Sequence, residues 1–228
     1  MKQLRTFLLA IIGVFSSFAP AWAGKSLSFD GSGDTVATSV TIDLDDALSI
    51  SVWVKVASVT TNNYAILGAT TSNRDYWMLL PRTNTNGLTL QHRRNTDSGG
   101  SMATTPTQNI SANTWTHVVV AKSSGSTVKI YQNNLKITEE SLSYTGYTPA
   151  QLYVGNQGDN ANWLNGKIDE VAVWNLELSA SEVTALYNSG SGASVLTIQS
   201  GGLQSYWKFD AVSGSTATDS SGNNRHGT

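Results

Sequence analysis

Cysteine is absent from the chain of 228 residues. Disulfides, thiolate zinc sites and cysteine nucleophiles are therefore excluded together. Charged residues are also scarce, at 13% against roughly 25% in an ordinary soluble domain. Lys and Arg number 14 against 16 Asp and Glu, so no basic excess exists to neutralise a phosphate backbone, and nucleic-acid binding is not expected. Apolar residues, at 39%, are still sufficient for a folded core, which argues against a wholly disordered chain.

Long apolar runs are missing beyond residues 1–23, which have the features of a signal peptide. Lys2 and Arg5 supply positive charge, a short apolar stretch follows at Phe7–Val14, and Ala21-Trp22-Ala23 is a small-residue cleavage signal. The apolar stretch is shorter than the roughly 20 residues that a membrane span requires. We predict cleavage after Ala23, no membrane span in the remaining chain, and a secreted, extracellular protein. Because an exported chain without cysteine has no disulfides, we favour a bacterial-type or virus-encoded secreted protein.

Motifs of hydrolytic and phosphate-binding sites are missing as well. The sequence contains no G-x-S-x-G nucleophile elbow and no G-x-x-x-x-G-K-[ST] phosphate loop. Retaining glycosidases need two carboxylates about 5 Å apart. The adjacent pairs Glu139-Glu140 and Asp169-Glu170 would face opposite ways in a regular strand. We interpret the chain as non-catalytic.

Short β-type segments separated by polar turns fill most of the chain. In Leu48–Val56, alternation places Ile50, Val52 and Val54 on one face, and we expect them to point inward. Phe29 should also be buried. Asn133-Asn134 predicts a tight hairpin, since Asn tolerates the positive φ that such turns need. Further strands are expected at 27–30, 36–42, 64–69, 76–80, 88–92, 115–122, 127–132, 135–138, 152–154, 167–174 and 203–209.

One short helix is predicted near the C-terminal end. Ser179 and Glu182 form a capping box, Leu178 and Val183 occupy the staple positions, and Gly190 is a plausible stop. The pattern as a whole predicts an all-β sandwich over residues 24–210. A polar C-terminal tail is expected over residues 211–228.

Six ordered segments carry a family resemblance. They are the strand and Asp-Gly turn at 27–34, the Trp-containing strand at 50–54, the strand at 115–120, the hairpin at 128–134, the segment at 166–174 and the helix at 178–187. Together they resemble the laminin-G-like, pentraxin-like jelly rolls of the concanavalin A-like lectin/glucanase superfamily. Residues 206–210 and 219–228 also match a segment that is usual beside such domains. The resemblance implies a two-sheet antiparallel jelly-roll sandwich. Glucanases of this fold generally carry Glu-x-Asp-x-x-Glu on one strand, which is absent here.

The resemblance also implies a structural Ca²⁺ ion where the first and late strands meet. The matching positions are Asp30 and Asp169, with a carbonyl from Gly31 and with Asp34 as a further candidate. Carboxylate and carbonyl oxygens are the ligands that Ca²⁺ prefers. The alternative is that Asp30 forms an Asx turn and that Asp169 accepts a hydrogen bond at a strand edge.

Carbohydrate sites combine aromatic faces with fixed polar groups. The candidates for a glycan-binding surface are Tyr76, Trp77, His92, Arg94, Asn156, Gln157, Asp159, Asn160 and Trp163. The tryptophans at 53, 115, 174 and 207 lie in strand patterns and are interpreted as packing residues. The predicted function is a glycan-binding or adhesion module that binds a glycan or glycoprotein surface. A structural subunit of an extracellular layer, filament or virion surface, assembled from copies of itself, is the alternative. A glycoside hydrolase of the same fold is the weaker one.

Overall fold

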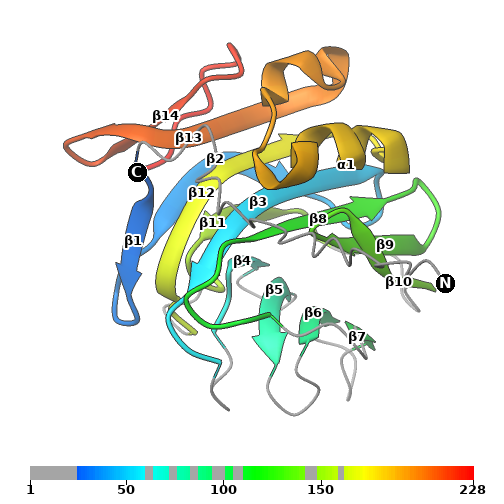
Figure 1. Cartoon of the computed structure of the whole chain (residues 1–228), viewed down its shortest axis with the longest axis horizontal. Coiled ribbons are helices and arrows are strands. Elements are labelled where there is room, and N and C mark those ends of the chain that lie inside the picture. The colour runs from blue at the N-terminus through cyan, green and yellow to red at the C-terminus, as the bar shows by residue number, and fades with distance from the viewer. Residues whose placement is uncertain are drawn as a thin grey trace, which may run out of the picture.

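The structure is a computed structural model that describes residues 25–59, 64–71, 76–82, 87–93, 101–104, 110–141, 148–158 and 162–228. Two antiparallel sheets pack face to face, as the all-β prediction requires (Figure 1). The eight-stranded sheet has the order β10-β9-β8-β3-β12-β13-β14, and β1 also pairs with β12. Its strands are β1 (Leu27–Asp30), β3 (Leu48–Val56), β8 (Thr116–Lys122), β9 (Thr127–Gln132), β10 (Leu135–Ser141), β12 (Asn165–Trp174), β13 (Leu203–Ser213) and β14 (Thr216–Asp219).

The six-stranded sheet has the order β2-β11-β4-β5-β6-β7. Its strands are β2 (Val36–Ile42), β4 (Leu67–Thr70), β5 (Tyr76–Arg82), β6 (Gly87–Arg93), β7 (Ser101–Thr104) and β11 (Ala150–Val154). The chain crosses between the two sheets at several loops, among them the loop from β2 to β3. No helix within the described ranges is long and apolar enough to cross a membrane.

The main core lies between the two sheets. Ile50, Val52 and Val54 are at most 2% exposed, and Phe29 is 4% exposed, which confirms the inward face predicted from alternation. They pack in one cluster with residues of the six-stranded sheet such as Leu152. Burial of a Val, Ile or Phe side chain contributes about 1.5–3 kcal/mol, so this cluster is the principal source of stability.

A second apolar layer covers the outer face of the eight-stranded sheet. Helix α1 (Ala180–Tyr187) and the short turns η1 (Asn188–Gly190), η2 (Val195–Thr197) and η3 (Ser200–Gly202) lie over this face (Figure 1). Val183 and Leu186 of the helix are buried in a cluster with Val119 and Trp174 of the sheet. Three of the tryptophans predicted to be packing residues are buried: Trp53, Trp174 and Trp207.

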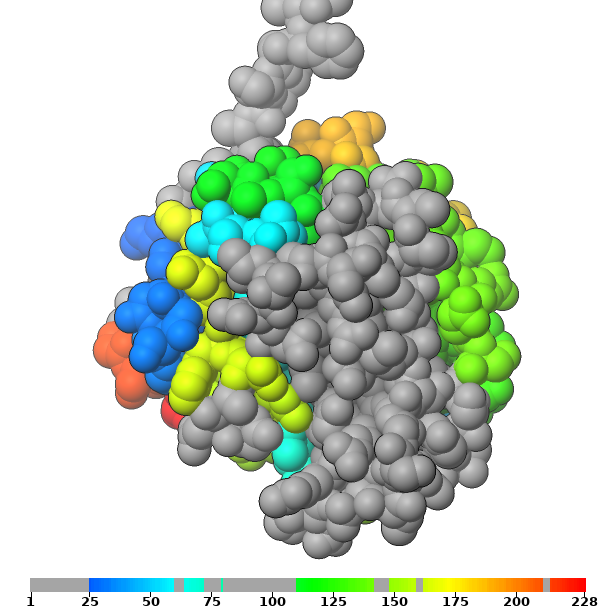
Figure 2. All heavy atoms as spheres, turned by 90° about the horizontal axis from the view of Figure 1, so that it is seen from below, coloured from blue at the N-terminus to red at the C-terminus, as the bar shows by residue number. Residues whose placement is uncertain are grey.

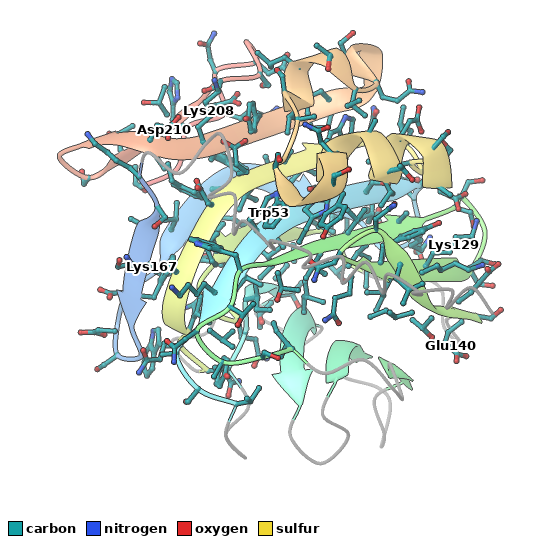
Figure 3. The ribbon with its side chains drawn as sticks, viewed as in Figure 1. Trp53, Lys129, Glu140, Lys167, Lys208 and Asp210 are labelled. Atoms are coloured by element: carbon teal, nitrogen blue, oxygen red, sulfur yellow. The ribbon has the colours of Figure 1, made fainter. Side chains whose placement is uncertain are left out.

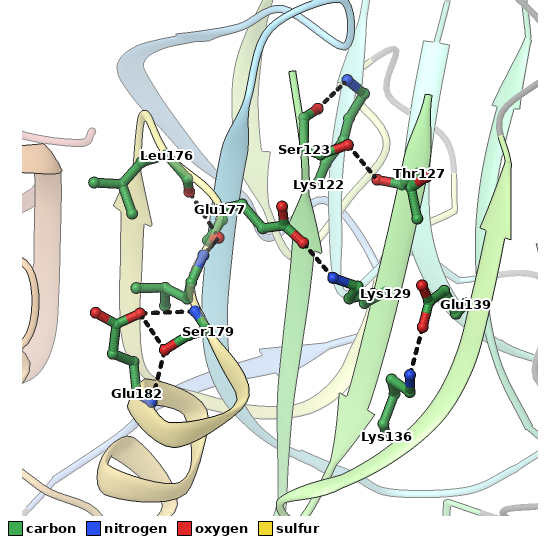
Figure 4. A network of polar contacts seen from close by, with 12 residues as sticks. Lys122, Ser123, Thr127, Lys129, Lys136, Glu139, Leu176, Glu177, Ser179 and Glu182 are labelled. Atoms are coloured by element: carbon green, nitrogen blue, oxygen red, sulfur yellow. Dashed lines mark hydrogen bonds and ion pairs between the residues drawn. The ribbon is translucent and has the colours of Figure 1, made fainter. Parts of the chain in front are cut away.

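The local turn and cap predictions are confirmed, with one correction. Ser179 and Glu182 form the capping box, in which the Ser179 N–H donates to the Glu182 carboxylate over 2.7 Å (Figure 4). The helix does not continue to Gly190. It ends at Tyr187 because Asn188 adopts the left-handed conformation, with φ of 44°, and caps it. Asn133 and Asn134 have φ of 48° and 68°, as the hairpin requires.

The expected polar tail over residues 211–228 is instead part of the sandwich. The backbone of Ala217 exchanges two hydrogen bonds with Gly227, and Ala37 of β2 exchanges two with Thr228. Asp219 accepts hydrogen bonds from the N–H groups of Tyr206, Ser221 and Arg225, each at 2.9 Å. A polar composition resembles a solvated tail, but here the segment's own side chains and backbone satisfy its polar groups.

Replacement of Asp219 by Ala should therefore destabilise the fold. Burial raises the pKa of Asp219, but the three N–H donors outweigh it, and the pKa lies below its ordinary value. Loss of several hydrogen bonds to a charged group should lower the free energy of unfolding by about 2–4 kcal/mol in urea titrations. The control is Glu140→Ala, an exposed carboxylate on the edge strand β10, which should change stability by less than about 0.5 kcal/mol. Equal effects of the two substitutions would contradict this role of Asp219.

Candidate functional site

The predicted glycan-binding residues fall into three groups in the structure. Arg94, Asp159 and Asn160 lie outside the described residues. Tyr76, Trp77 and His92 lie on two paired strands, where the register places Trp77 opposite His92 and Tyr76 opposite Arg93. The two pairs are neighbours along β5 and β6, but successive positions of a strand belong to opposite faces of the sheet, so the Trp77–His92 pair and the Tyr76–Arg93 pair lie on different faces. A glycan-binding surface built from these residues stays a prediction.

The amides of Asn156 and Gln157 are not available to a ligand. They are 1% and 5% exposed, respectively. The Asn156 Oδ1 accepts a hydrogen bond from the Gly158 N–H over 2.8 Å, and the Gln157 side chain accepts one from the Asn162 amide. The loop also packs so closely on β4 that a Cβ at Gly68 would lie 2.7 Å from the Gln157 Cα. These amides shape the loop, whereas Trp163, at its end, is partly exposed.

The acidic residues predicted to share Ca²⁺ are not brought together. Asp30 lies opposite Asn165, four positions along β12 from Asp169, which corresponds to about 13 Å. Asp30 is exposed, and its Oδ1 accepts from the Ser32 N–H over 2.8 Å, while Asp34 accepts from the Asp30 N–H over 2.9 Å. The alternative interpretation, a local Asx turn, is thus the observed one for Asp30.

These donor sets do not fit a shared metal ion. Among the residues that the structure describes, no group of three or more His, Cys, Asp and Glu side chains could hold a metal. The carbonyl of Gly31 remains next to Asp30, but Asp169 is 1% exposed and belongs to a different cluster. The predicted site shared by Asp30 and Asp169 is therefore wrong, while calcium binding by the chain stays a prediction.

A groove opens at the edge of the sandwich, between β1 and the turn that joins β13 to β14. Its volume is about 240 Å³, and its walls include Leu27, Asp34, Val36 and Ser215. Figure 2 shows β1, in blue, beside the orange C-terminal hairpin at this edge. Phe29, its aromatic residue, is only 4% exposed, so the groove lacks the exposed ring face on which sugars stack.

Buried polar side chains gather on the outer face of the eight-stranded sheet, beside helix α1. The Ser51 Oγ lies 2.8 Å from the His117 Nε2. The His117 ring stacks on Trp53 with a centroid separation of 4.9 Å, and Tyr187 at the end of the helix lies 6.0 Å from both rings. Figure 3 shows Trp53 on β3 directly beside the helix. The cluster therefore joins the helix to the sheet through aromatic contacts.

An irregularity in β12 adds two carboxyl groups to this cluster. Asp169 pairs with Trp53 and Ala172 pairs with Ser51, so an extra residue is accommodated between them. Glu170 takes a positive φ of 51° at this bulge. The bulge lets Glu170 reach the same outer-face cavity as Ser51 and His117, although adjacent residues of a regular strand would face opposite ways. The Tyr206 hydroxyl donates a hydrogen bond to the Glu170 carboxylate.

Burial dominates the electrostatics of the cluster. It raises the pKa of Asp169 to about 8, and the charges of Glu170 and Asp210 act in the same direction. Burial also raises the pKa of Glu170, although the Tyr206 hydrogen bond opposes it. It lowers the pKa of His117 to about 3, so the ring is neutral at physiological pH. Lys208 and Asp210 lie on the neighbouring strand β13 (Figure 3).

The cluster has no room for a substrate. The cavity that Ser51, His117 and Glu170 line has a volume of about 10 Å³, enough for about one water molecule. Ser51 and His117 are at most 2% exposed. The arrangement can hold protons and connect the helix to the sheet, but a nucleophile or acid here could not reach a glycosidic bond.

Stability should depend on pH through Asp169. Its pKa is about 8 when folded and ordinarily 3.8, so between these values the folded chain retains a proton that the unfolded chain loses, and stability falls as pH rises. His117 acts oppositely only between about 3 and its ordinary 6.5. From pH 6.5 to 8 the free energy of unfolding should therefore fall, by up to about 1.4 kcal/mol per pH unit.

The measurement is urea unfolding of the wild type and of Asp169→Asn at pH 6.5, 7.2 and 8. The substitution preserves side-chain volume and removes the titrating group, so the decline should flatten. Asp30→Asn, in the exposed turn, is the control and should retain the wild-type decline. The same slope in Asp169→Asn as in the wild type would show that another group is responsible.

Several solved structures have a similar fold. A heptameric SAP-like pentraxin from Limulus polyphemus has a TM-score of 0.60 at 17% identity, covering 85% of this chain and 95% of the pentraxin chain. A putative carbohydrate binding protein from Bacteroides ovatus has a TM-score of 0.61 at 17% identity, covering 90% of this chain and 58% of that one. The CBM40 of a Ruminococcus gnavus IT-sialidase, bound to α2,3-sialyllactose, has a TM-score of 0.53 at 18% identity, covering 71% of this chain and 95% of the CBM40 chain. At these identities the similarity shows the fold alone.

The sequence itself matches one family. No curated protein sequence matches this chain. The model of the concanavalin A-like lectin/glucanases superfamily matches residues 30–184, which run from the end of β1 into helix α1 and make up more than half of the chain. The resemblance carried by the six sequence segments is therefore confirmed. The chain belongs to the concanavalin A-like lectin/glucanase superfamily.

Proposed function

We propose that the chain is a secreted, non-catalytic module that binds glycans or mediates adhesion. The observation that carries this proposal is its fold, which it shares with a protein described as carbohydrate-binding and with a sialidase CBM40 bound to a sialylated sugar. Family membership agrees with it.

The absence of a catalytic role is supported by four acidic residues in the described part of the chain. Asp169 and Glu170 are 1% and 8% exposed and border a cavity of about 10 Å³. Glu177 is paired with Lys129 over 2.7 Å, and Asp219 is occupied by backbone N–H groups. A retaining glycosidase needs two carboxyl groups about 5 Å apart in a cleft that is open to the sugar. None of these carboxylates meets that requirement.

Two places are candidates for glycan contact: the end of β5 and β6 at Tyr76 and Arg93, and Trp163, whose neighbour Asn162 accepts a hydrogen bond from the Ala65 N–H. Tyr76 and Arg93 are directly opposite in these strands. Trp163 is the partly exposed aromatic residue that follows the loop of Asn156 and Gln157. Aromatic faces supply the stacking surface that sugars require, while the buried amides hold the loop in shape.

A glycan array with the chain from Gly24 to Thr228 tests the proposal. We expect binding to one glycan class, and Trp163→Ala or Tyr76→Ala should weaken it about tenfold in calorimetry, equivalent to about 1.4 kcal/mol. The control is Leu135→Ala, an apolar residue that is 54% exposed on the edge strand β10 and should leave affinity unchanged. The array is run with Ca²⁺ and with EDTA. No glycan bound in either condition, together with ordered polymers in light scattering, would favour the assembly role.

The proposed export predicts removal of residues 1–23. Intact-mass analysis of protein collected outside the expressing cell should find Gly24 as the first residue, because Ala21 and Ala23 fit the small-residue pockets of a signal peptidase. Replacement of Ala23 by a bulky residue such as Phe should block that cleavage. Exported protein that still begins at Met1 would refute the processing step.

A further inference from the structure

Lys122 is a lysine that is 2% exposed, at the end of β8. An ammonium ion removed from water is strongly destabilising unless hydrogen bonds replace its hydration. The structure supplies those bonds. The Lys122 Nζ donates to the carbonyl oxygens of Asp46 at 3.0 Å, Ser123 at 2.9 Å and Gly125 at 2.9 Å. All three ammonium hydrogens are therefore used, and the contact with Ser123 is visible in Figure 4.

The three carbonyls come from two separate segments. Asp46 lies in the loop through which the chain crosses from β2, in the six-stranded sheet, to β3, in the eight-stranded sheet. Ser123 and Gly125 lie in the turn between β8 and β9. Lys122 also pairs through its backbone with Leu48 at the start of β3. The ammonium thus joins the crossover loop to the turn beside it.

Negative charge surrounds these carbonyls. The carboxylates of Asp45, Asp46 and Asp43 raise the pKa of Lys122 and oppose the larger, lowering effect of burial. The crossover loop is itself ordered by a hydrogen bond from the Asp45 N–H to the Asp43 Oδ1 over 2.9 Å. Neutral carbonyl oxygens inside and carboxylates outside make an environment suited to a positive ion.

The size of the oxygen cage indicates which ion it suits. Its carbonyls lie 2.9–3.0 Å from the ammonium nitrogen. Ca²⁺ requires oxygens at 2.3–2.6 Å, so the cage is too wide for it. An ammonium group and a potassium ion are similar in size, and backbone carbonyls are ligands that replace the hydration shell of K⁺.

We propose that this cage is a monovalent cation site that the chain fills with its own lysine, and that without the Lys122 ammonium it binds K⁺ or a small alkylammonium ion. The Lys122 ammonium stabilises the loop that crosses between the two sheets, so no ion from solution is needed there. This site is independent of the proposed glycan function, and neither depends on the other.

The test is cation rescue of Lys122→Ala, which removes the ammonium and leaves its space. Thermal unfolding is followed in choline chloride, NaCl, KCl and methylammonium chloride at equal ionic strength. The variant should melt about 10 °C below the wild type in choline, which is too large for the cage. Methylammonium or K⁺ should raise its melting temperature saturably, by at least about 3 °C. The wild type should respond equally to all four salts.

Two control variants separate cation binding from general salt effects. Lys122→Met keeps the length of the side chain and fills the cage with a neutral group, so it should be destabilised but should show no cation-specific recovery. Lys129→Ala removes a lysine whose ammonium binds the Glu177 carboxylate rather than a carbonyl cage, and it should also show none. The proposal is overturned if Lys122→Ala has the same melting temperature in choline as in the KCl and methylammonium solutions. It is also overturned if Lys122→Met shows the same cation-specific rise, or if Lys122→Ala remains unfolded in every salt while Lys122→Met folds.

Discussion

Strand β3 is buried on both of its faces, and the arrangement of the other elements depends on this constraint. Its inner face, with Ile50, Val52 and Val54, contributes to the core between the sheets. Its outer face carries Ser49 and Ser51, which are at most 1% exposed and therefore need hydrogen-bond partners. The Ser49 hydroxyl donates to the Leu176 carbonyl and accepts from the Leu178 N–H, both at 2.8 Å. The segment that enters helix α1 is thus bound directly to the middle of the sheet.

Patterns that act over short distances made much of the fold predictable. Alternation along Leu48–Val56 identified the inner face, Ser179 and Glu182 identified the helix start, and Asn133-Asn134 identified a hairpin. Each depends on residues a few positions apart. The polar segment after Phe209 was misjudged because its partners are distant. Gly227 forms a bridge with Thr38, and no local pattern reports such a pairing.

The candidate sites were harder to predict for the same reason. Asp30 and Asp169 do lie on paired strands, β1 and β12. The register of this pair keeps the two residues apart, and it cannot be predicted from the sequence of either strand. The bulge at Glu170 depends on how β12 pairs with β3, so the shared burial of Glu170 with His117 could not be inferred. The burial of Lys122 could not be predicted either, because a lysine in a β-strand is ordinarily exposed. Two features of the sequence did indicate a buried polar cluster. They are the adjacent acidic residues Asp169 and Glu170 and the single His117 in an apolar strand.

The pairing of early strands with late ones also determines when the chain can fold. β1 pairs with residues 165–168, and Ala37 of β2 bonds to Thr228. Contacts between residues so far apart form slowly, because a long loop must close before they contribute any stability. The emerging chain therefore has no strand partner for β1 or β2 until β11 and β12, from residue 150 onward, have been synthesised. The export that we propose would use this property, because only a polypeptide that is still open can be threaded through a narrow channel.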